Sequence, residues 1–160
     1  MIRAIRTDDC DAIATIEAQT FNTALDRGRL LTFMKKRTFC GFVDDANIPN
    51  TTDELNYTDM SSNLVGYLLA TIILDEAEIL SIVVSPDHQN CGRGAGLLGH
   101  FLAYIDAQDV KTALLEVAAD NVSALTLYHR HGFAEFGRRP FYYKRSDGDC
   151  DAIMMRRLSD

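Results

Sequence analysis

A glycine-rich turn near the middle of the chain has the composition of a phosphate-binding site. The segment SPDHQNCGRGAGLLGHFL follows an apolar run at residues 79–84 and leads into apolar residues at helical spacing. Gly92, Gly94 and Gly96 leave the main chain open, so backbone N–H groups and the positive end of a helix dipole can bind a phosphate. A glycine in a helix costs roughly 1 kcal/mol relative to alanine, so several at one helix start need a reason. Tight packing of this helix on a sheet is the alternative interpretation.

The same segment contains the glycine spacing of a dinucleotide-binding motif, from Gly94 to Gly99. Glu116 lies downstream, where that motif carries a ribose-binding acid. In the dinucleotide fold the first glycine ends the strand, whereas residues 86–93 separate the strand from Gly94 in this chain. Too little sequence follows for a doubly wound sheet. We therefore set the dinucleotide interpretation aside.

A carboxylate, an amide and a phenol follow in the segment LLEVAADNVSALTLYHRHGF. Glu116 ends a short apolar run, and a carboxylate in such a place can act as a general base. Asn121 and Tyr128 lie seven residues apart on an expected helix, so both face one side and can contact one extended ligand. An ion-paired carboxylate at a strand end and an aromatic core residue are the alternative interpretations of Glu116 and Tyr128.

The elements that must position these side chains follow from the spacing of apolar residues. The sequence predicts helices at residues 7–16, 26–36, 92–105 and 121–131, and strands at 38–43, 64–74, 79–84, 113–117, 133–137 and 152–158. This order indicates one α/β (α+β) domain, in which about four helices flank a mixed, mostly antiparallel sheet. The nearly continuous apolar strand at 79–84 is expected to be buried on both faces. Residues 44–63 are expected to form a long surface loop, and 138–149 a connection.

Composition narrows the class of protein. With 160 residues, of which 47% are hydrophobic and 24% charged, the chain fits one ordinary globular domain. A formal net charge of −7 argues against a nucleic-acid partner and favours a cationic substrate. The absence of a long apolar run or a signal peptide leads us to expect a cytoplasmic protein with no membrane partner. The scattered cysteines and histidines predict reduced thiols and no metal site.

Two motifs, in this order along the chain, resemble the coenzyme A site of GNAT acetyltransferases. The first is the pattern Gln-x-x-Gly-x-Gly-Ala at residues 89–95, and the second spans residues 116–133. The resemblance implies a single GNAT-like domain with acetyl-CoA as the acetyl donor. It implies donor-binding residues in the strand, the loop and the later helix: Ile82, Val83, Val84, Gln89, Asn90, Cys91, Gly92, Arg93, Gly94, Ala95, Asn121 and Tyr128.

More narrowly, the tail GRRPFYYKRSDGDCDAIMM is similar to the end of RimI-type members of that family, which acetylate the N-terminal alanine of a ribosomal protein. This resemblance implies that Glu116 is the general base, that Asn121 contacts the pantetheine and that Tyr128 protonates the departing thiolate. An ordinary phenol has a pKa near 10 and an ordinary thiol near 8.5, so such a transfer requires a site that holds the two groups together. Glu78 is the second candidate for the base, or for a group that binds the acceptor ammonium.

The acceptor side is less well defined by the sequence. We expect Phe21, Glu78, Arg139, Tyr142 and Tyr143 to line the acceptor groove, although packing at an edge strand explains the last three equally well. Two departures from the RimI pattern leave the acceptor open. Ala118 stands where many of these enzymes have arginine, and the segment at 44–63 is unusually long.

Together these observations predict an N-acetyltransferase that acts on the α-amino group of a protein N-terminus, with an Ala-initiated ribosomal protein as its partner. An enzyme for a small amine or an aminoacyl-tRNA is the alternative, and the second option gains support from a basic patch formed by Arg138, Arg139, Lys144 and Arg145. A non-catalytic acyl-CoA-binding module would keep residues 89–95 but would not need Glu116 or Tyr128. We expect a monomer or a weak dimer.

Overall fold

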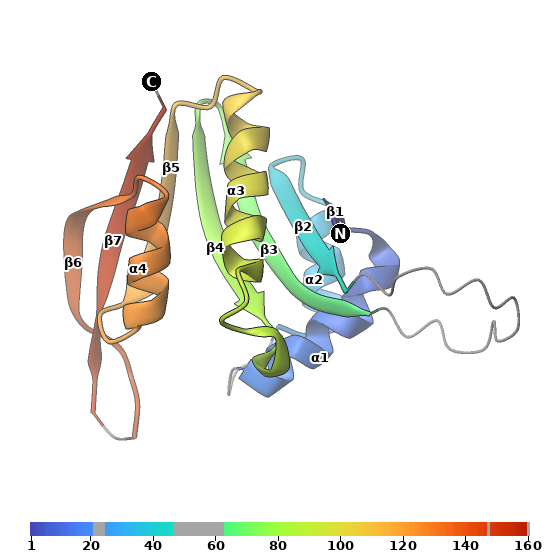
Figure 1. Cartoon of the computed structure of the whole chain (residues 1–160), viewed down its shortest axis with the longest axis horizontal. Coiled ribbons are helices and arrows are strands. Elements are labelled where there is room, and N and C mark those ends of the chain that lie inside the picture. Colours follow the sequence, from blue (N-terminus) through green and yellow to red (C-terminus); the bar gives the residue numbers. More distant parts are fainter. Residues whose placement is uncertain (21–24, 47–62, 147, 160) are drawn as a thin grey trace, which may run out of the picture.

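The computed structural model of the chain describes residues 1–20, 25–46, 63–146 and 148–159. Within these residues, seven strands form one sheet in the order β1-β2-β3-β4-β5-β7-β6, with four α-helices packed on it (Figure 1). The strands are β1 (Ile2–Ala4), β2 (Phe39–Asp45), β3 (Leu64–Ile73), β4 (Glu76–Val84), β5 (Thr112–Ala118), β6 (Ala134–Tyr143) and β7 (Cys150–Leu158). The helices are α1 (Cys10–Thr20), α2 (Arg27–Met34), α3 (Arg93–Asp106) and α4 (Val122–Arg130). Neighbouring strands are antiparallel except β4 and β5, which confirms the expected mixed fold.

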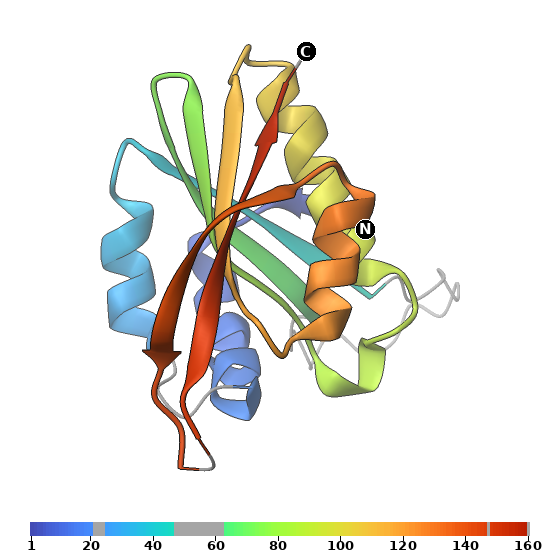
Figure 2. The ribbon, with the colours of Figure 1, turned by 90° about the vertical axis from the view of Figure 1, so that its left-hand side faces the viewer.

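The two faces of the sheet are covered by different helices (Figure 2). Helices α1 and α2 pack on one face of β2, β3 and β4, around an apolar cluster that includes Ile13, Leu30 and Tyr67. Helix α3 packs on the opposite face, and a second cluster there joins Phe101 of α3 to Tyr128 of α4. Burial of such side chains is the main force that holds helices on a sheet. The sheet is therefore the middle layer of three.

Strands β4 and β5 are paired along only part of their length. Residues 76–79 pair in parallel with residues 112–115, and beyond these pairs the strands diverge (Figure 1). On the other side of β4, a bulge at Leu80 shifts the register with β3. A bulge bends a strand and increases its twist, so it helps to turn the end of β4 away from β5. The divergence leaves main-chain groups of both strands at an opening inside the sheet.

The structure corrects three of the strand predictions. It adds β1, which is only three residues long and leaves no period in the sequence. Strand β6 continues through residues 138–143, where the sequence predicts a connection, because an exposed edge strand needs no apolar alternation. Strand β4 is not buried on both faces: Glu76, Glu78 and Leu80 are exposed, because α3 covers the other face of this part of the sheet.

Two further predictions concern segments near chain positions 7 and 44. The first predicted helix begins with a short 3-10 turn at Thr7–Asp9, and α1 follows it directly. The predicted loop at 44–63 starts with the last residues of β2, and residues 47–62 lie outside the described residues. Phe21, predicted to contact the acceptor, also lies outside them.

Candidate functional site

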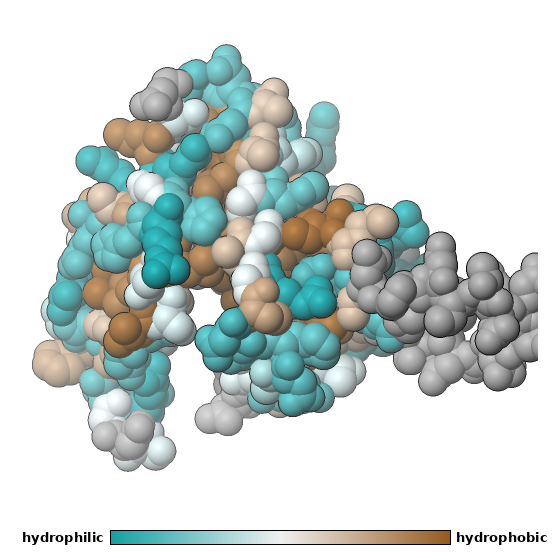
Figure 3. Space-filling view, viewed as in Figure 1, coloured by the Kyte–Doolittle hydropathy of each residue, from teal (hydrophilic) through white to brown (hydrophobic). Residues whose placement is uncertain are grey.

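A cleft opens where β4 and β5 diverge. Its volume is about 930 Å³, and it is lined by the ends of both strands, the loop before α3, one side of α4 and Tyr143. The space-filling view shows the molecule hollowed between the α4 side and the α3 side (Figure 3). Glu116 lines this cleft together with most of the predicted donor-binding residues: Ile82, Val83, Val84, Gln89, Asn90, Gly92, Arg93, Gly94, Ala95, Asn121 and Tyr128. Cys91 is not among the lining residues, and its Sγ donates to the carbonyl of His88 at 2.8 Å.

The main chain of β4 presents polar groups to the cleft. The N–H of Ser85 donates to the carbonyl of Val65 on β3 at 2.8 Å. Because successive residues of a strand direct their N–H groups to opposite sides, the N–H of Val83 also points to β3. The N–H groups of Ile82 and Val84 then point to the side on which β5 has diverged. These two groups are free to bind polar atoms of a ligand that lies along the strand.

The start of α3 forms a cradle for an anion. Gly92 is the N-cap residue and has a φ of 83°, in the left-handed region that favours glycine. The first bond within the helix runs from the N–H of Gly96 to the carbonyl of Gly92, at 2.9 Å. The N–H groups of Arg93, Gly94 and Ala95 precede this bond, so no helix carbonyl is available to them. These donors and the helix dipole suit the diphosphate of coenzyme A.

Two side chains brace this cradle. The side-chain amide of Gln89 donates to the carbonyl of Val84 at 3.0 Å and so fixes the loop to the end of β4. The guanidinium of Arg93 forms an ion pair with Asp44 of β2 at 2.9 Å, and the Asp44 side chain is 7% exposed. Arg93 therefore anchors the start of α3 to β2 with its side chain, and its main-chain N–H group faces no helix carbonyl.

Asn121 is the N-cap residue of α4. Its side-chain oxygen accepts from the N–H of Ala124 at 3.1 Å and from the hydroxyl of Ser123 at 3.0 Å. A cap of this kind satisfies one of the unpaired donors at a helix start. The prediction of a ligand contact through Asn121 is thereby restricted to its amide nitrogen.

Tyr128 is buried at the wall of the cleft. Its side chain is 5% exposed, and its ring packs edge-to-face on Phe133 with centroids 5.9 Å apart. Burial, with a smaller contribution from nearby Tyr143, raises the pKa of the Tyr128 phenol to about 12. The phenol therefore keeps its proton at neutral pH and can donate a hydrogen bond to a ligand.

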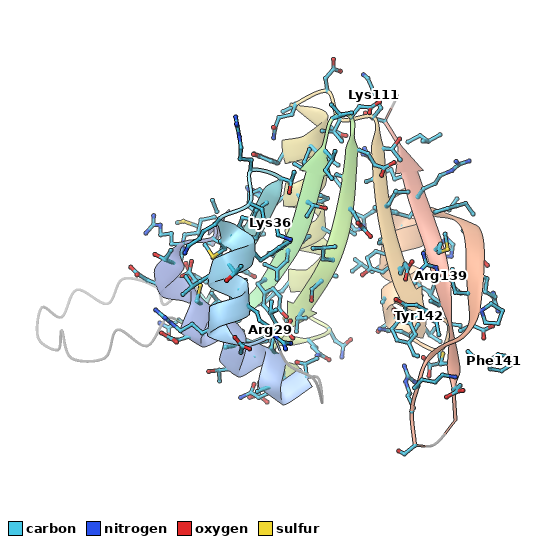
Figure 4. The ribbon with its side chains drawn as sticks, turned by 180° about the vertical axis from the view of Figure 1, so that it is seen from behind. Arg29, Lys36, Lys111, Arg139, Phe141 and Tyr142 are labelled. Carbon is cyan, nitrogen blue, oxygen red and sulfur yellow. The ribbon has the colours of Figure 1, made fainter. Side chains whose placement is uncertain are left out.

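Glu116 is paired with an arginine from the edge of the sheet. Its carboxylate lies 3.1 Å from Arg139 of β6, and both side chains are accessible to solvent, at 27% and 50%. The guanidinium of Arg139 also lies 5.4 Å from the ring centre of Tyr142. Figure 4 shows Arg139 and Tyr142 together near β5 and β7, with Phe141 farther out. Burial and then the negative charge of Glu116 raise the pKa of Tyr143, which lines the cleft.

The structure separates the two carboxylates predicted as candidates for the base. Glu116 lines the cleft, whereas Glu78 is exposed on the part of β4 that still pairs with β5. Sequence reasoning missed several polar residues of the lining, among them Ser81, Arg130 and His131. A serine within an apolar strand carries little signal, and the two basic residues are explained by their place at the end of α4.

No group of three histidine, cysteine, aspartate or glutamate side chains in the described part of the chain is arranged to hold a metal ion. None of the described helices is both long enough and apolar enough to span a bilayer.

The fold and the cleft define a class of protein that sequence comparison also identifies. The profile of the Acetyltransferase (GNAT) family matches residues 12–133, so the chain belongs to the GNAT family. Among individual relatives, the [ribosomal protein bS18]-alanine N-acetyltransferase of Escherichia coli K12 is 38% identical over 95 residues. The match covers 59% of this chain and 64% of the E. coli enzyme. An uncharacterized N-acetyltransferase of Methanocaldococcus jannaschii is 28% identical over 156 residues, which cover 97% of this chain and 89% of the relative.

Solved structures agree with this assignment. The crystal structure of the ribosomal-protein-S18-alanine N-acetyltransferase from Escherichia coli superposes with a TM-score of 0.84 at 28% identity, and the alignment covers 99% of this chain and 92% of that one. Arabidopsis thaliana NAA60, solved in complex with a bisubstrate analogue, gives a TM-score of 0.82 at 18% identity, with 99% of this chain and 97% of that chain covered. The second similarity concerns the fold alone.

Proposed function

We propose that this protein is an N-acetyltransferase that moves an acetyl group from acetyl-CoA to the α-amino group of a protein N-terminus. The observation that carries the proposal is the cleft itself, which joins an anion cradle at the start of α3 to a carboxylate and a phenol, Glu116 and Tyr128. Bound acetyl-CoA supplies a thioester, which is the activated acyl group. The same cleft can thus hold a phosphorylated donor and the groups that move protons.

In this proposal the main chain holds the donor. The N–H groups of Arg93, Gly94 and Ala95 bind the diphosphate, and those of Ile82 and Val84 bind amide oxygens of the pantetheine arm. Main-chain donors of this kind are already in place before the ligand arrives, so they cost little reorganisation on binding. The arrangement requires glycine where the chain turns into α3, which is the position of Gly92.

Glu116 and Tyr128 have complementary proton-transfer roles in the proposal. An α-amino group with an ordinary pKa of about 7.7–8.0 is largely protonated at neutral pH, so Glu116 must accept a proton before the nitrogen attacks. Tyr128 then donates its proton toward the sulfur as negative charge develops there. Its pKa of about 12 exceeds that of an ordinary thiol, and burial of the sulfur in the cleft reduces this mismatch because it disfavours the thiolate.

We further propose an Ala-initiated ribosomal protein as the acceptor, because the E. coli relatives are named for this activity. Ribosomal proteins and acetyl-CoA meet in the cytoplasm, which is where the proposal places the reaction. The alternative of an aminoacyl-tRNA loses support from the structure, since every member of the predicted basic patch is paired with an acid: Arg138 with Glu135 and Asp151, Arg139 with Glu116, Lys144 with Asp149, and Arg145 with Asp120.

The test is incubation of the purified protein with acetyl-CoA and peptides that differ in their first residue, followed by mass spectrometry. We expect one added acetyl group on the α-amine of an Ala-initiated ribosomal peptide, and less on peptides that begin with bulky residues. Transfer to a small amine but to no peptide would favour the small-amine enzyme. Tight binding of coenzyme A without transfer to any amine would favour a non-catalytic module.

A further inference from the structure

Glu17 of α1 is buried, and no cationic partner for it is found in the described part of the chain. Glu17 is 5% exposed. In the described part of the chain, only two other acidic residues are buried, Asp9 and Asp44. Asp9 and Asp44 are each paired with an arginine, at 2.8 and 2.9 Å. No ion pair of Glu17 is found among the described residues. Burying a polar side chain is costly unless it is hydrogen-bonded, so the contacts of Glu17 determine whether its position is stable.

Within the described residues, Glu17 has two hydrogen-bond donors as partners. One carboxylate oxygen accepts from the Tyr67 hydroxyl of β3, and the other accepts from the N–H of Leu25 at 3.3 Å. The oxygen of Tyr67 lies 3.4 Å from the hydroxyl oxygen of Ser81 on β4. Burial and the bond to Glu17 raise the pKa of Tyr67, so the phenol stays protonated. Three side chains from three elements therefore form one connected series of polar contacts.

The direction of the hydrogen bonds in this series follows from the number of hydroxyl protons that are available. Tyr67 has one hydroxyl proton, and its hydroxyl donates that proton to the side-chain oxygen of Glu17. Between Tyr67 and Ser81, the hydroxyl of Ser81 must then be the donor. With its one proton directed inward, Ser81 has only lone pairs left for the cleft that it lines. Ser81 thus presents a hydrogen-bond acceptor to any ligand there.

Ser81 and Glu116 lie on the same face of the opened sheet. Ser81 follows the bulge at Leu80, and its partner Tyr67 belongs to the cluster beneath α1 and α2. On β5, Leu115 and Val117 belong to the opposite cluster, beneath α3 and α4, so Glu116 between them faces the α1 side. Figure 4 views the molecule from this side. The anion cradle lies at α3, so a donor and an acceptor can approach the opening from opposite faces.

We propose that the hydroxyl oxygen of Ser81 accepts a hydrogen bond from the amino group of the acceptor substrate, with Tyr67 and Glu17 as the positioning residues that orient it. The ligand is an N–H donor, a primary amine or its ammonium form, and the inference rests on the function proposed above. The lone pairs of Ser81 and the carboxylate of Glu116 then bind the same nitrogen from two strands. A carbonyl oxygen at this position would face lone pairs and is disfavoured.

The test separates binding of the acceptor from binding of the donor. Ser81→Ala is expected to raise the KM for an Ala-initiated peptide about tenfold, the loss of one hydrogen bond to a charged group. Its affinity for coenzyme A, measured by calorimetry, should match that of the wild type. Ser81→Thr retains the hydroxyl on a strand-compatible side chain and should restore the KM.

A double-mutant cycle tests whether Tyr67 acts through Ser81. Tyr67→Phe removes the hydroxyl and should raise the acceptor KM several-fold, whereas Tyr104→Phe on the partly exposed side of α3 is the matched control and should not change it. In the Ser81→Ala background, Tyr67→Phe should add little to the KM, because the hydroxyl through which Tyr67 acts is already absent. Full additivity in the cycle would overturn the orienting role of Tyr67, and thermal denaturation of each variant identifies any loss of fold.

The outcomes distinguish this inference from the proposed function. Transfer by the wild type together with an unchanged acceptor KM in Ser81→Ala rejects the role of Ser81 and leaves the acetyltransferase proposal standing. Failure of the wild type to acetylate any amine, while it binds coenzyme A, rejects the proposed function and the role of Ser81 with it.

Discussion

Alanine at Gly92 should weaken the binding of coenzyme A and destabilise the fold for separate reasons. Gly92 has a φ of 83°, and a Cβ added there would meet no atom within 4 Å. The left-handed backbone costs an alanine about 1–2 kcal/mol, and we expect the free energy of unfolding to fall by that amount. Because strain of this kind acts on the free and the bound protein alike, it does not by itself change affinity.

The affinity should fall because of where the new methyl group lies. Gly92 lines the cleft and no protein atom surrounds its Cβ position, so we expect the methyl group to occupy open space beside the bound anion. We expect the Kd for coenzyme A to rise about tenfold, which corresponds to roughly 1.4 kcal/mol. Isothermal calorimetry gives the Kd, and urea denaturation monitored by circular dichroism gives the free energy of unfolding.

Two glycines within α3 extend this test: Gly99 is the matched control, and Gly94 is a second position of the cradle. A Cβ at Gly99 also meets no atom within 4 Å, but its φ is not positive and it lies deep in α3, so Gly99→Ala should stabilise the helix by roughly 1 kcal/mol and leave the Kd unchanged. A Cβ at Gly94 would make an ordinary contact with Leu127 at 3.6 Å. Gly94→Ala should therefore keep or raise stability while it weakens binding. Wild-type affinity in both Gly92→Ala and Gly94→Ala would refute the anion cradle and support tight packing as the reason for these glycines.

Three further predictions concern the walls of the cleft. The pKa of Tyr128, about 12 in the folded protein against about 10 for an ordinary phenol, means that stability is fully present below pH 10 and is lost as the pH rises toward 12. Tyr128→Phe should therefore reduce the loss of unfolding free energy at alkaline pH by up to about 3 kcal/mol. It should also lower kcat far more than it changes the affinity for coenzyme A, and a kcat equal to that of the wild type would remove Tyr128 from the mechanism. Asn121→Ala should destabilise α4 by about 1 kcal/mol in urea denaturation, whereas Asn121→Asp keeps the capping oxygen and should leave stability unchanged. Both variants lack the amide nitrogen, so a raised Kd for coenzyme A in both would show that this nitrogen binds the ligand. Arg139→Gln should change the free energy of unfolding by less than about 1 kcal/mol, because its pair with Glu116 is solvent-accessible, and it should lower the acceptor KM; a raised KM would make Arg139 a group that binds the acceptor directly.

Local patterns were sufficient to predict the helices, the apolar strands and the glycine-rich helix start. The regular spacing of Leu97, Leu98 and Phe101 determines which face of α3 is buried, and these three side chains are fully buried in the structure. By contrast, β6 is a strand because it pairs with β7, and its exposed residues carry no period of their own. Pairing between strands is a tertiary property that a local pattern does not record.

The polar contacts of the site were harder to predict because they join distant parts of the sequence. Glu17 and Tyr67 are 50 residues apart, and nothing around either residue indicates the other. The same holds for Arg93 and Asp44, which are 49 residues apart. In both cases the sequence supplies the residue types, and only the folded sheet brings them together. Asn121 shows the reverse, since its own sequence neighbourhood already explains its capping role.

The short run of pairing between β4 and β5 has a consequence for the molecule as a whole. Among the described residues, only 76–79 and 112–115 join the two halves of the sheet by strand pairing, so these halves are held together less firmly than the strands within each half. A ligand that spans the divergence contacts both halves of the sheet and holds them together. Binding of the ligand then raises the free energy of unfolding, by about 2.7 kcal/mol at a ligand concentration of one hundred times the Kd. The thermal stability of this protein should therefore depend on the concentration of acetyl-CoA around it.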